Sequence, residues 1–322
     1  MPPTAAHRDA RPYPVPPPGR PVRVAFVGAR TYYEPAALHH ATAGLAPAFV
    51  DFRDPSEAGA LRDKLDEFAP HVVVVFRPES IPVGLFADLR AAVLGFASGP
   101  LPRPGERSHP SLEANLAALG GADRANFDRV IVLDGDGFDA AAGGVPAWRS
   151  MPLPVDDRLF GPVRPARRPP RMIFIGYSTM HREQTLIAVK HELDIGHYAH
   201  GLVGEELERA LAAADIGINV HGDQWVDTFE HVALIHLAAG HLLISEPLRP
   251  TFGLEPGIDF LEVENRDELN LRLHQLTQQP DAYDRIRVRG RDKAEQYRAS
   301  RLWPEVIGDL LADVEAFGTD RP

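Results

Sequence analysis

The sequence predicts an α/β protein with two doubly wound domains, each built on a parallel sheet. Short β-branched and aromatic runs alternate with amphipathic stretches along most of the chain, which is typical of parallel strands joined by helices. The alternation stops once, in a segment rich in proline and arginine, and then starts again. A length of 322 residues allows two domains of about 150 residues, each with its own core.

The first domain is predicted over residues 21–160. The twenty residues before it are proline-rich and lack the apolar region of a signal peptide, so they are predicted to be a disordered tail. The stretch SEAGALRDKLDEFA, at 56–69, has the apolar period of a helix. The predicted strands are VRVAFVG (22–28), AFVDFR (48–53), HVVVVFR (71–77) and RVIVLD (129–134).

The second domain is predicted over residues 171–298, after an interdomain linker at 161–170. The linker belongs to PLPVDDRLFGPVRPARRPP, which crowds prolines and arginines without periodicity. The final segment, 299–322, contains an amphipathic helix. The predicted strands lie at 171–176, 193–199, 215–220 and 241–245, and the predicted helices at 182–191, 204–214 and in the segment that ends at Gly240.

Composition excludes several classes of protein. A formal charge of −11 and a pI near 5.7 argue against a nucleic-acid or anionic-membrane surface as the main partner. The absence of cysteine excludes disulfides and thiolate metal sites. No stretch has the length of a membrane span, so the sequence predicts a cytoplasmic protein without stable membrane insertion.

The strand-to-helix turns lack the common nucleotide and hydrolase motifs. The turns GARTYYEP and GYSTMHRE do not give G-x-G-x-x-G, and the chain has neither a G-x-x-x-x-G-K-[ST] loop nor a G-x-S-x-G elbow. A dehydrogenase, a P-loop protein and an α/β-hydrolase are therefore not predicted.

The segment FEHVALIHLAAGHLLISEP places three histidines five residues apart. Positions five apart on a helix are rotated by about 140°, so His231 and His236 cannot share a face as zinc ligands do. His241 lies beyond Gly240, in a predicted strand. No metal is predicted here, and His236 is expected to be a buried, hydrogen-bonded histidine. Asp134 and Asp136 have the spacing of an Asp-x-Asp metal motif, which would argue for a metal. The alternative is that they belong to a glycine-rich turn.

Four segments follow one another between residues 150 and 295. They are PLPVDDRLF, MIFIGYSTMHRE, ALAAADIGINVH and HLAAGHLLISEPLRPTFGLEPGIDFLEVENRDEL. In this order they resemble motifs of GT-B glycosyltransferases, in the group that includes the spore-maturation (CgeB-like) proteins. The resemblance implies two Rossmann-like domains that face each other across a cleft, with the C-terminal helix packing back on the first domain. The first half of the chain carries no motif of the family.

The resemblance also implies a donor site in the second domain. In the family, the helix that ends at Ala-x-Gly directs its N-terminus at the donor diphosphate, where the helix dipole and free N–H groups favour an anion. The family's Glu-x7-Glu pattern is absent, because Ile235 stands at its second position and Asp227 at its first. Either Asp227 and Glu230 divide the two roles or the ribose is held differently, and for Glu230 a helix-stabilising carboxylate is the alternative. The implied donor residues of this segment are Asp227, Thr228, Phe229, Glu230 and His231.

Two further loops are implied in donor binding. A departing diphosphate needs positive charge or N–H donors beside it. After MIFIG the chain offers Gly176, His181 and Arg182, and Arg182 resembles the family's phosphate-binding arginine or lysine, with a surface charge as the alternative. His200 and Gly201 end the next strand, where the fold places the nucleobase.

The first domain is expected to bind the acceptor. Gly28, Arg30 and Arg77 follow carboxyl ends of predicted strands and are candidates for the acceptor side. An inverting enzyme needs a general base, for which Glu34, Glu79 and His109 are candidates that no spacing separates.

The sequence thus predicts a metal-independent glycosyltransferase that uses a nucleotide sugar as co-substrate and no other cofactor. Its acceptor is a small molecule or a glycan, and the protein is a monomer or a homodimer. A nucleotide-sugar epimerase or hydrolase of the same fold and a non-catalytic nucleotide-sugar-binding protein are the alternatives.

Overall fold

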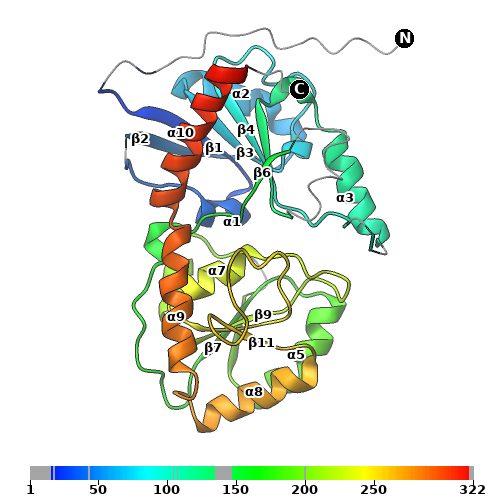
Figure 1. Ribbon diagram of the computed structural model, residues 1–322, viewed down its shortest axis with the longest axis vertical. Helices are drawn as coiled ribbons and strands as arrows, with labels where there is room; N and C mark the ends of the chain where they lie inside the picture. The colour runs from blue at the N-terminus through cyan, green and yellow to red at the C-terminus, as the bar shows by residue number, and fades with distance from the viewer. Residues whose placement is uncertain are drawn as a thin grey trace. The chain divides into compact units, whose positions relative to one another are not determined.

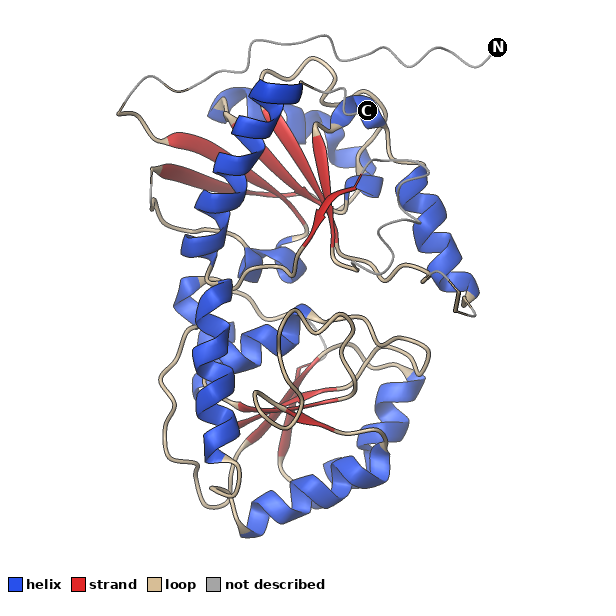
Figure 2. Cartoon of the chain, in the orientation of Figure 1, coloured by secondary structure: helices blue, strands red, loops and turns tan. Residues whose placement is uncertain are grey.

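The computed structural model describes residues 16, 19–42, 44–103, 105–106, 108–134, 147–198 and 201–318. The chain forms two compact units, one made of residues 1–151 with 299–322 and the other of residues 152–298. Each unit is a parallel sheet with helices on both of its faces (Figures 1 and 2). The predicted proline-rich tail lies almost entirely outside the described residues.

The N-terminal unit contains a six-stranded sheet in the order β2-β1-β3-β4-β5-β6. All neighbouring strands pair in parallel. Four of these strands were predicted, while β4 and β6 were not. Helices α1 (Arg30–Tyr33), α2 (Ala58–Phe68) and α3 (Pro110–Gly120) belong to this unit. The strands are β1 (Val22–Gly28), β2 (Leu45–Asp51), β3 (Val72–Phe76), β4 (Ala92–Ala97), β5 (Arg129–Val132) and β6 (Ala147–Ser150).

The last helix, α10 (Ala299–Phe317), also belongs to the N-terminal unit. It lies along the sheet of this unit, in red in Figure 1. Trp303 is fully buried, its ring meets the ring of Phe26 edge-on at 5.0 Å, and its indole nitrogen donates to the carbonyl of Ala36 at 2.7 Å. Near the other end of the helix, Arg129 of β5 forms an ion pair with Asp313. The helix is therefore held at both ends.

The C-terminal unit contains a five-stranded parallel sheet in the order β11-β10-β9-β7-β8. Helices and strands predicted for this region are confirmed, and β11 is an additional short strand. The strands are β7 (Met172–Ile175), β8 (Ile195–Tyr198), β9 (Ile216–Asn219), β10 (Leu242–Ser245) and β11 (Leu261–Glu262). The helices are α5 (Met180–Glu192), α6 (Gly204–Ala212), α7 (His231–Ala238), α8 (Arg266–Gln278) and α9 (Asp284–Ala294).

The segment predicted as an interdomain linker is part of the C-terminal unit. The N–H of Gly161 donates to the carbonyl of Ala238 at 3.0 Å, and the carbonyl of Gly161 accepts from Arg291 at 2.7 Å. Arg167 forms an ion pair with Asp215 at 2.9 Å. These contacts hold residues 161–170 on this unit, so its boundary lies at residues 151 and 152.

The end of α7 is packed in the core through two histidines. His236 and His241 are 0% and 1% exposed, and their Nδ1 atoms are 3.1 Å apart. Nε2 of His241 lies 2.8 Å from the carbonyl oxygen of Leu211, so it carries the proton and Nδ1 of His241 accepts from His236. The expected buried, hydrogen-bonded state of His236 is confirmed. A Cβ atom at Gly217 of β9 would lie 2.3 Å from the His236 ring, so this strand position requires glycine.

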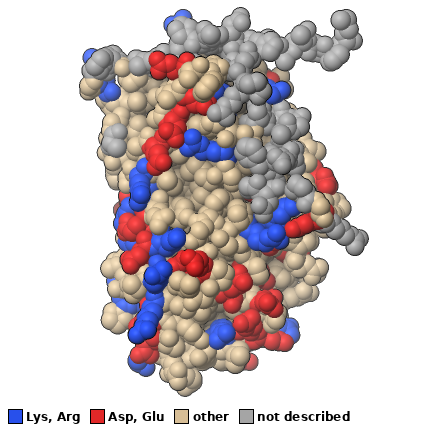
Figure 3. All heavy atoms as spheres, in the orientation of Figure 1, with Lys and Arg blue, Asp and Glu red and all other residues tan. Residues whose placement is uncertain are grey.

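The described helices include none that is long and apolar enough to cross a membrane. On the face of the molecule drawn in Figure 3, acidic and basic side chains are interspersed. That face offers no extended area of positive charge among the described residues.

Candidate functional site

Charged side chains converge at the carboxyl edge of the C-terminal sheet. Parallel strands end at the same edge, and there the loops after β7, β9 and β10 meet the first turns of α5 and α7. The side chains that connect to one another are His181, Arg182, His221, Glu230 and Glu246, which we call the edge network.

Hydrogen bonds from its backbone N–H and from its guanidinium hold Arg182 in place. Thr179 stands three residues before Arg182, and its side-chain oxygen caps α5 by accepting from the N–H of Arg182 at 3.2 Å. Its Nε donates to the carbonyl of Val220 at 2.8 Å, and its Nη1 donates to the carbonyl of Tyr177 at 3.3 Å. Its Nη2 donates to the carboxylate of Glu230 at 3.1 Å. These bonds fix the guanidinium behind the edge of the sheet, where it is only 9% exposed.

Gly176 makes room for this guanidinium. A Cβ atom at position 176 would lie 2.9 Å from Nη1 of Arg182. The carbonyl of Gly176 accepts from Nε2 of His197 at 2.9 Å, and Nδ1 of His197 accepts from Lys190 at 3.0 Å. Lys190 also pairs with Glu183 at 3.2 Å. This second chain of bonds holds the loop after β7 from the side of α5.

The surroundings of His221 favour the positively charged form of its ring. Its Nδ1 lies 3.3 Å from Oε1 of Glu230, and its Nε2 lies 2.6 Å from the carbonyl oxygen of Pro247. Both partners only accept hydrogen bonds, so both ring nitrogens carry protons. Burial alone would lower the pKa of His221, but the hydrogen bond and charge of Glu230 raise it above its usual value. His221 and Arg182 thus share the carboxylate of Glu230.

Glu246 joins the two halves of the network. Its Oε2 accepts from the backbone N–H of His221 at 2.6 Å, and its Oε1 lies 2.8 Å from Nε2 of His181. The side chain of His181 is 20% exposed, whereas that of His221 is 3% exposed. The side chain of Glu230 is 23% exposed. His181 and Glu230 are therefore the members that solvent or a ligand reaches, while Arg182, His221 and Glu246 are more deeply buried.

The structure brings four of the predicted donor residues together: Gly176, His181, Arg182 and Glu230. Arg182 and Glu230 were predicted to reach the donor from two different loops, and in the structure they also bind each other because α5 and α7 begin at the same edge. His221 and Glu246 were not predicted. Glu246 directly follows the buried strand β10, and His221 stands two residues after the buried strand β9, which is the signal in the sequence that could have identified them.

The other predicted donor residues lie outside the network. Thr228 and Phe229 are buried, and the ring of Phe229 packs edge-on against Phe252 at 5.2 Å. Asp227 pairs with Arg249 at 3.4 Å. Nε2 of His231 lies 2.7 Å from the carbonyl oxygen of Pro154, and burial lowers the pKa of His231 to about 4. Gly201 precedes α6 and takes part in none of the network's bonds, and His200 lies outside the described residues.

In the N-terminal unit, the predicted acceptor residues form local contacts. Arg77 pairs with Glu79 at 2.9 Å. The backbone N–H of Arg30 donates to Asp51 at 2.8 Å, and its guanidinium lies 5.0 Å from the centre of the Phe49 ring. Gly28 packs closely, since a Cβ there would lie 3.1 Å from the side chain of Phe76.

The candidates for a general base have different surroundings. Glu34 is 5% exposed, with His39 3.6 Å from its carboxylate. His109 caps α3, because its Nδ1 accepts from the N–H of Ser111 at 3.2 Å. Glu79 is the more exposed of the two glutamates, with a side chain that is 21% exposed.

The Asp-x-Asp hint is only partly described. Asp134 is fully buried and pairs with Arg103 at 3.4 Å, whereas Asp136 lies outside the described residues. Within the described part of the chain, no group of three or more histidine and carboxylate side chains is placed to hold a metal ion.

No protein-family model and no curated protein matches the sequence. Solved structures do share its fold. The structure of HepE from Anabaena in complex with UDP and glucose aligns over 91% of this chain and 100% of its own, with 12% identity and a TM-score of 0.58. Sucrose-phosphate synthase from Thermosynechococcus elongatus aligns over 92% and 99%, with 13% identity and a TM-score of 0.56. A glycosyltransferase from Rickettsia africae aligns over 91% and 99%, with 10% identity and a TM-score of 0.51.

These structural neighbours are GT-B glycosyltransferases, and this chain shares their arrangement of two α/β units with parallel sheets. At this level of identity the likeness is one of fold. The narrower resemblance to CgeB-like proteins stays a prediction.

Proposed function

We propose that the protein is a glycosyltransferase whose C-terminal unit binds a nucleotide-sugar donor at the edge network. The observation that supports this most directly is the network itself, in which the buried side chains of Arg182 and His221 bind the carboxylate of Glu230 beside an accessible histidine at the start of a 13-residue helix. Fixed groups of this kind suit a reaction in which negative charge develops on a leaving diphosphate. HepE, which shares the fold, was solved with UDP and glucose.

In the proposed complex, the diphosphate contacts the first turn of α5. Backbone N–H groups there and the positive end of the helix dipole favour an anion. His181 faces this position and, when protonated beside Glu246, adds a positive charge. Arg182 and His221 act one layer further back, where they orient the carboxylate of Glu230 toward hydroxyl groups of the donor.

The proposed reaction needs neither a metal nor a cofactor. The bond between the anomeric carbon and the diphosphate oxygen breaks, and its electron pair leaves with the nucleoside diphosphate. The acceptor oxygen bonds to the anomeric carbon and loses its proton to a base. We propose that the N-terminal unit binds the acceptor, with Glu79 as the leading candidate for the base because it is more exposed than Glu34 and does not cap a helix as His109 does.

The first experiment measures donor binding. We expect UDP or another nucleoside diphosphate to bind and to raise the melting temperature, since a ligand at a hundred times its dissociation constant adds about 2.7 kcal/mol to stability. His181→Ala should weaken binding. The matched control is His274→Ala, which removes an exposed histidine of α8 that pairs with Glu192. If no nucleoside diphosphate binds, or if both variants bind it alike, the proposed donor site is wrong.

The second experiment identifies the reaction. Bound nucleotide sugars are incubated with a panel of sugar and small-molecule acceptors, with and without a chelator. We expect a glycosylated product, formed at the same rate in the chelator. Free sugar released at one rate with or without acceptor would identify a hydrolase or epimerase instead, and binding without any turnover would identify a binding protein.

A further inference from the structure

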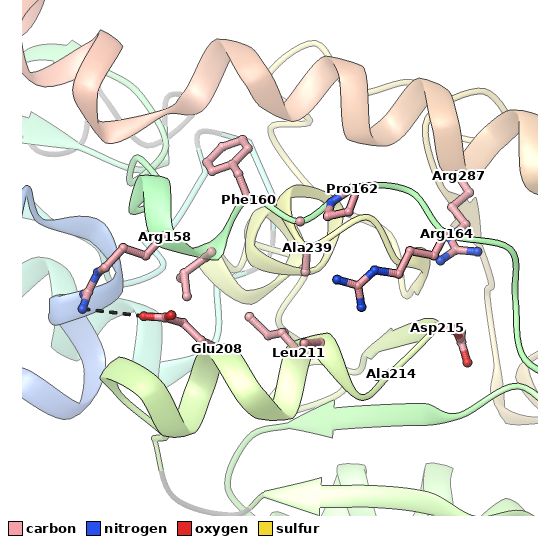
Figure 4. A pocket seen from close by; sticks show the side chains of 13 residues that line it. Arg158, Phe160, Pro162, Arg164, Glu208, Leu211, Ala214, Asp215, Ala239 and Arg287 are labelled. Carbon is pink, nitrogen blue, oxygen red and sulfur yellow. Dashed lines mark ion pairs between the residues drawn. The ribbon is translucent and has the colours of Figure 1, made fainter.

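A pocket of about 260 Å³ lies in the C-terminal unit, at the opposite end of the sheet from the edge network. Two of its residues, Ala214 and Asp215, directly precede β9, and Ala239 follows α7. The segment from Arg158 to Arg164 forms one side, and the end of α6 and Arg287 of α9 form the rest (Figure 4). The volume is several times the ~30 Å³ that one water molecule occupies in the liquid.

Arg287 is a buried cation without a carboxylate partner among the described residues. It is 4% exposed, and its Nε donates to the carbonyl of Gly240 at 2.6 Å. Asp215 is the acidic residue that shares the pocket, but its oxygens accept from Arg167 at 2.9 Å and from the N–H of Arg171 at 2.9 Å. Burial lowers the pKa of Arg287, and the charges of Asp215 and Asp284, which form no ion pair with it, offset this only in part. Burying a guanidinium without an anion beside it lowers the stability of the folded state, so an anion bound beside Arg287 would be stabilising.

Arg164 adds a second cation to the same part of the pocket. Its side chain is exposed and, within the described part of the chain, makes neither a hydrogen bond nor an ion pair. In Figure 4 the side chain of Arg164 points toward Ala239. Arg287 and Asp215 lie at the same end of the pocket as Arg164. The far end differs, because Arg158 is neutralised there by Asp156 at 2.7 Å and by Glu208 at 3.7 Å. The pocket therefore has one end with unpaired positive charge and one end that is neutral.

Between these two ends, part of the lining is apolar. Leu211, Pro162 and Ala239 line the pocket beside Arg164 (Figure 4). A lone inorganic ion would contact the arginines and leave this apolar surface in water. A ligand with an apolar body would remove its own apolar surface and that of the pocket from water. This burial favours binding by about 25 cal/mol per Å² of apolar surface covered.

We propose that this pocket binds a small organic oxyanion, a phosphate monoester or a carboxylate, with its charged head at Arg164 and Arg287. Guanidinium groups bind both kinds of head through paired, charge-assisted hydrogen bonds. The compact apolar body lies against Leu211, Pro162 and Ala239. The site is separate from the edge network, and the inference stands whether or not the protein is a glycosyltransferase.

Calorimetric titration with three probes tests the proposal: inorganic phosphate, phenyl phosphate and benzoate. The titrations are run in excess UDP, so that any phosphate site at the edge network is occupied. We expect phenyl phosphate or benzoate to bind more tightly than inorganic phosphate. The tighter of the two identifies the head as a phosphate or a carboxylate.

Variants locate the site. Arg164→Gln removes an exposed charge and should weaken binding about tenfold, which corresponds to one charge-assisted hydrogen bond. Arg287→Lys keeps the charge and a donor for Gly240 but loses the planar fork, and it should weaken binding in a protein whose circular dichroism is unchanged. The control Arg285→Gln changes an exposed arginine of the same helix and should leave binding intact. The proposal is overturned if none of the probes binds in excess UDP, or if Arg164→Gln and Arg285→Gln bind alike.

Discussion

Two groups of buried histidines in the C-terminal unit have opposite surroundings. His221, in the loop after β9, bonds to the carboxylate of Glu230 and to a carbonyl, and Glu230 raises its pKa. His236 and His241, at the end of α7, bond to each other, His241 also bonds to the carbonyl of Leu211, and burial lowers the pKa of both. All three residues are buried. Burial alone therefore does not decide the charge of a histidine here, because the presence or absence of a neighbouring carboxylate does.

The two kinds of surroundings give the free energy of unfolding opposite dependences on pH. The folded pKa of His221 is raised, so its contribution is fully present below the unfolded pKa of about 6.5 and is lost as the pH rises through the folded value. The folded pKa of His241 is lowered to about 4, so the unfolded state takes up its proton first and stability falls as the pH drops from about 6.5 toward 4. For these groups, maximum stability lies near pH 6.5.

The largest effect is expected from Gly217→Ala, which fills the space of the histidine pair. The new Cβ would lie 2.3 Å from the His236 ring, so the ring or the strand must move. We expect a loss of about 3 kcal/mol in the free energy of unfolding, at the upper end of typical overpacking costs. Denaturant unfolding measures it.

The control for that variant is Gly59→Ala in α2, where an added Cβ meets no atom within 4 Å. Alanine favours a helix over glycine, so this variant should be more stable by about 0.5–1 kcal/mol. Equal stabilities for the two variants would contradict the tight packing described for the pair.

The next largest effect is the fall in the free energy of unfolding as the pH drops below 6.5. Protonation of His241 should cost about 3 kcal/mol between pH 6.5 and 4, as follows from its lowered pKa. His241→Gln keeps a donor for the carbonyl of Leu211 and removes the titrating ring, so the curve should become shallower in this range. His191→Gln, at an exposed position of α5, should leave the slope unchanged. The measurement is a series of denaturant unfolding curves from pH 4 to 7.

Glu230→Gln is expected to have a smaller effect at the other end of α7. It leaves Arg182 and His221 without their shared carboxylate, and because the side chain is 23% exposed we expect a cost of about 2 kcal/mol at pH 6. The difference from the wild-type protein should narrow as the pH rises and His221 loses its proton. A difference that is constant from pH 6 to 9 would contradict the charged state of His221.

The smallest effect on stability is expected from His181→Ala. The ring is on the accessible side of the network, so its loss should cost about 0.5 kcal/mol. Thermal unfolding at neutral pH measures this change. A loss as large as that of Glu230→Gln would show that the bond of His181 to Glu246 stabilises the network as much as the bonds that Arg182 and His221 share with Glu230.

The sequence was sufficient for the alternation of elements and for part of the edge network. The valine-rich run of β3 and the strands β9 and β10 are buried on both faces, and their apolar runs predict this. β6 was missed because it has only four residues, all half-buried, and no apolar run. Its place at the edge of the sheet follows from pairing with β5 and not from its own residues.

The bonds within the network could not be predicted, because they depend on the order of strands in the sheet. Arg182 and Glu230 are 48 residues apart in the sequence, and His221 and Glu246 are 25 apart. They meet because β9 lies between β7 and β10 in the sheet. Local pattern marks each strand, but it does not state which strand lies next to which.

The position of α10 determines the order in which the two units can fold during synthesis. Residues 152–298 are continuous, so the C-terminal unit is complete as soon as they have left the ribosome. The N-terminal unit has most of its sheet earlier, yet Trp303 reaches Ala36 only after 267 further residues have been made. Until then, the surface around Phe26 that Trp303 later covers is exposed to water. The half of the protein that is translated first is therefore the half that is finished last.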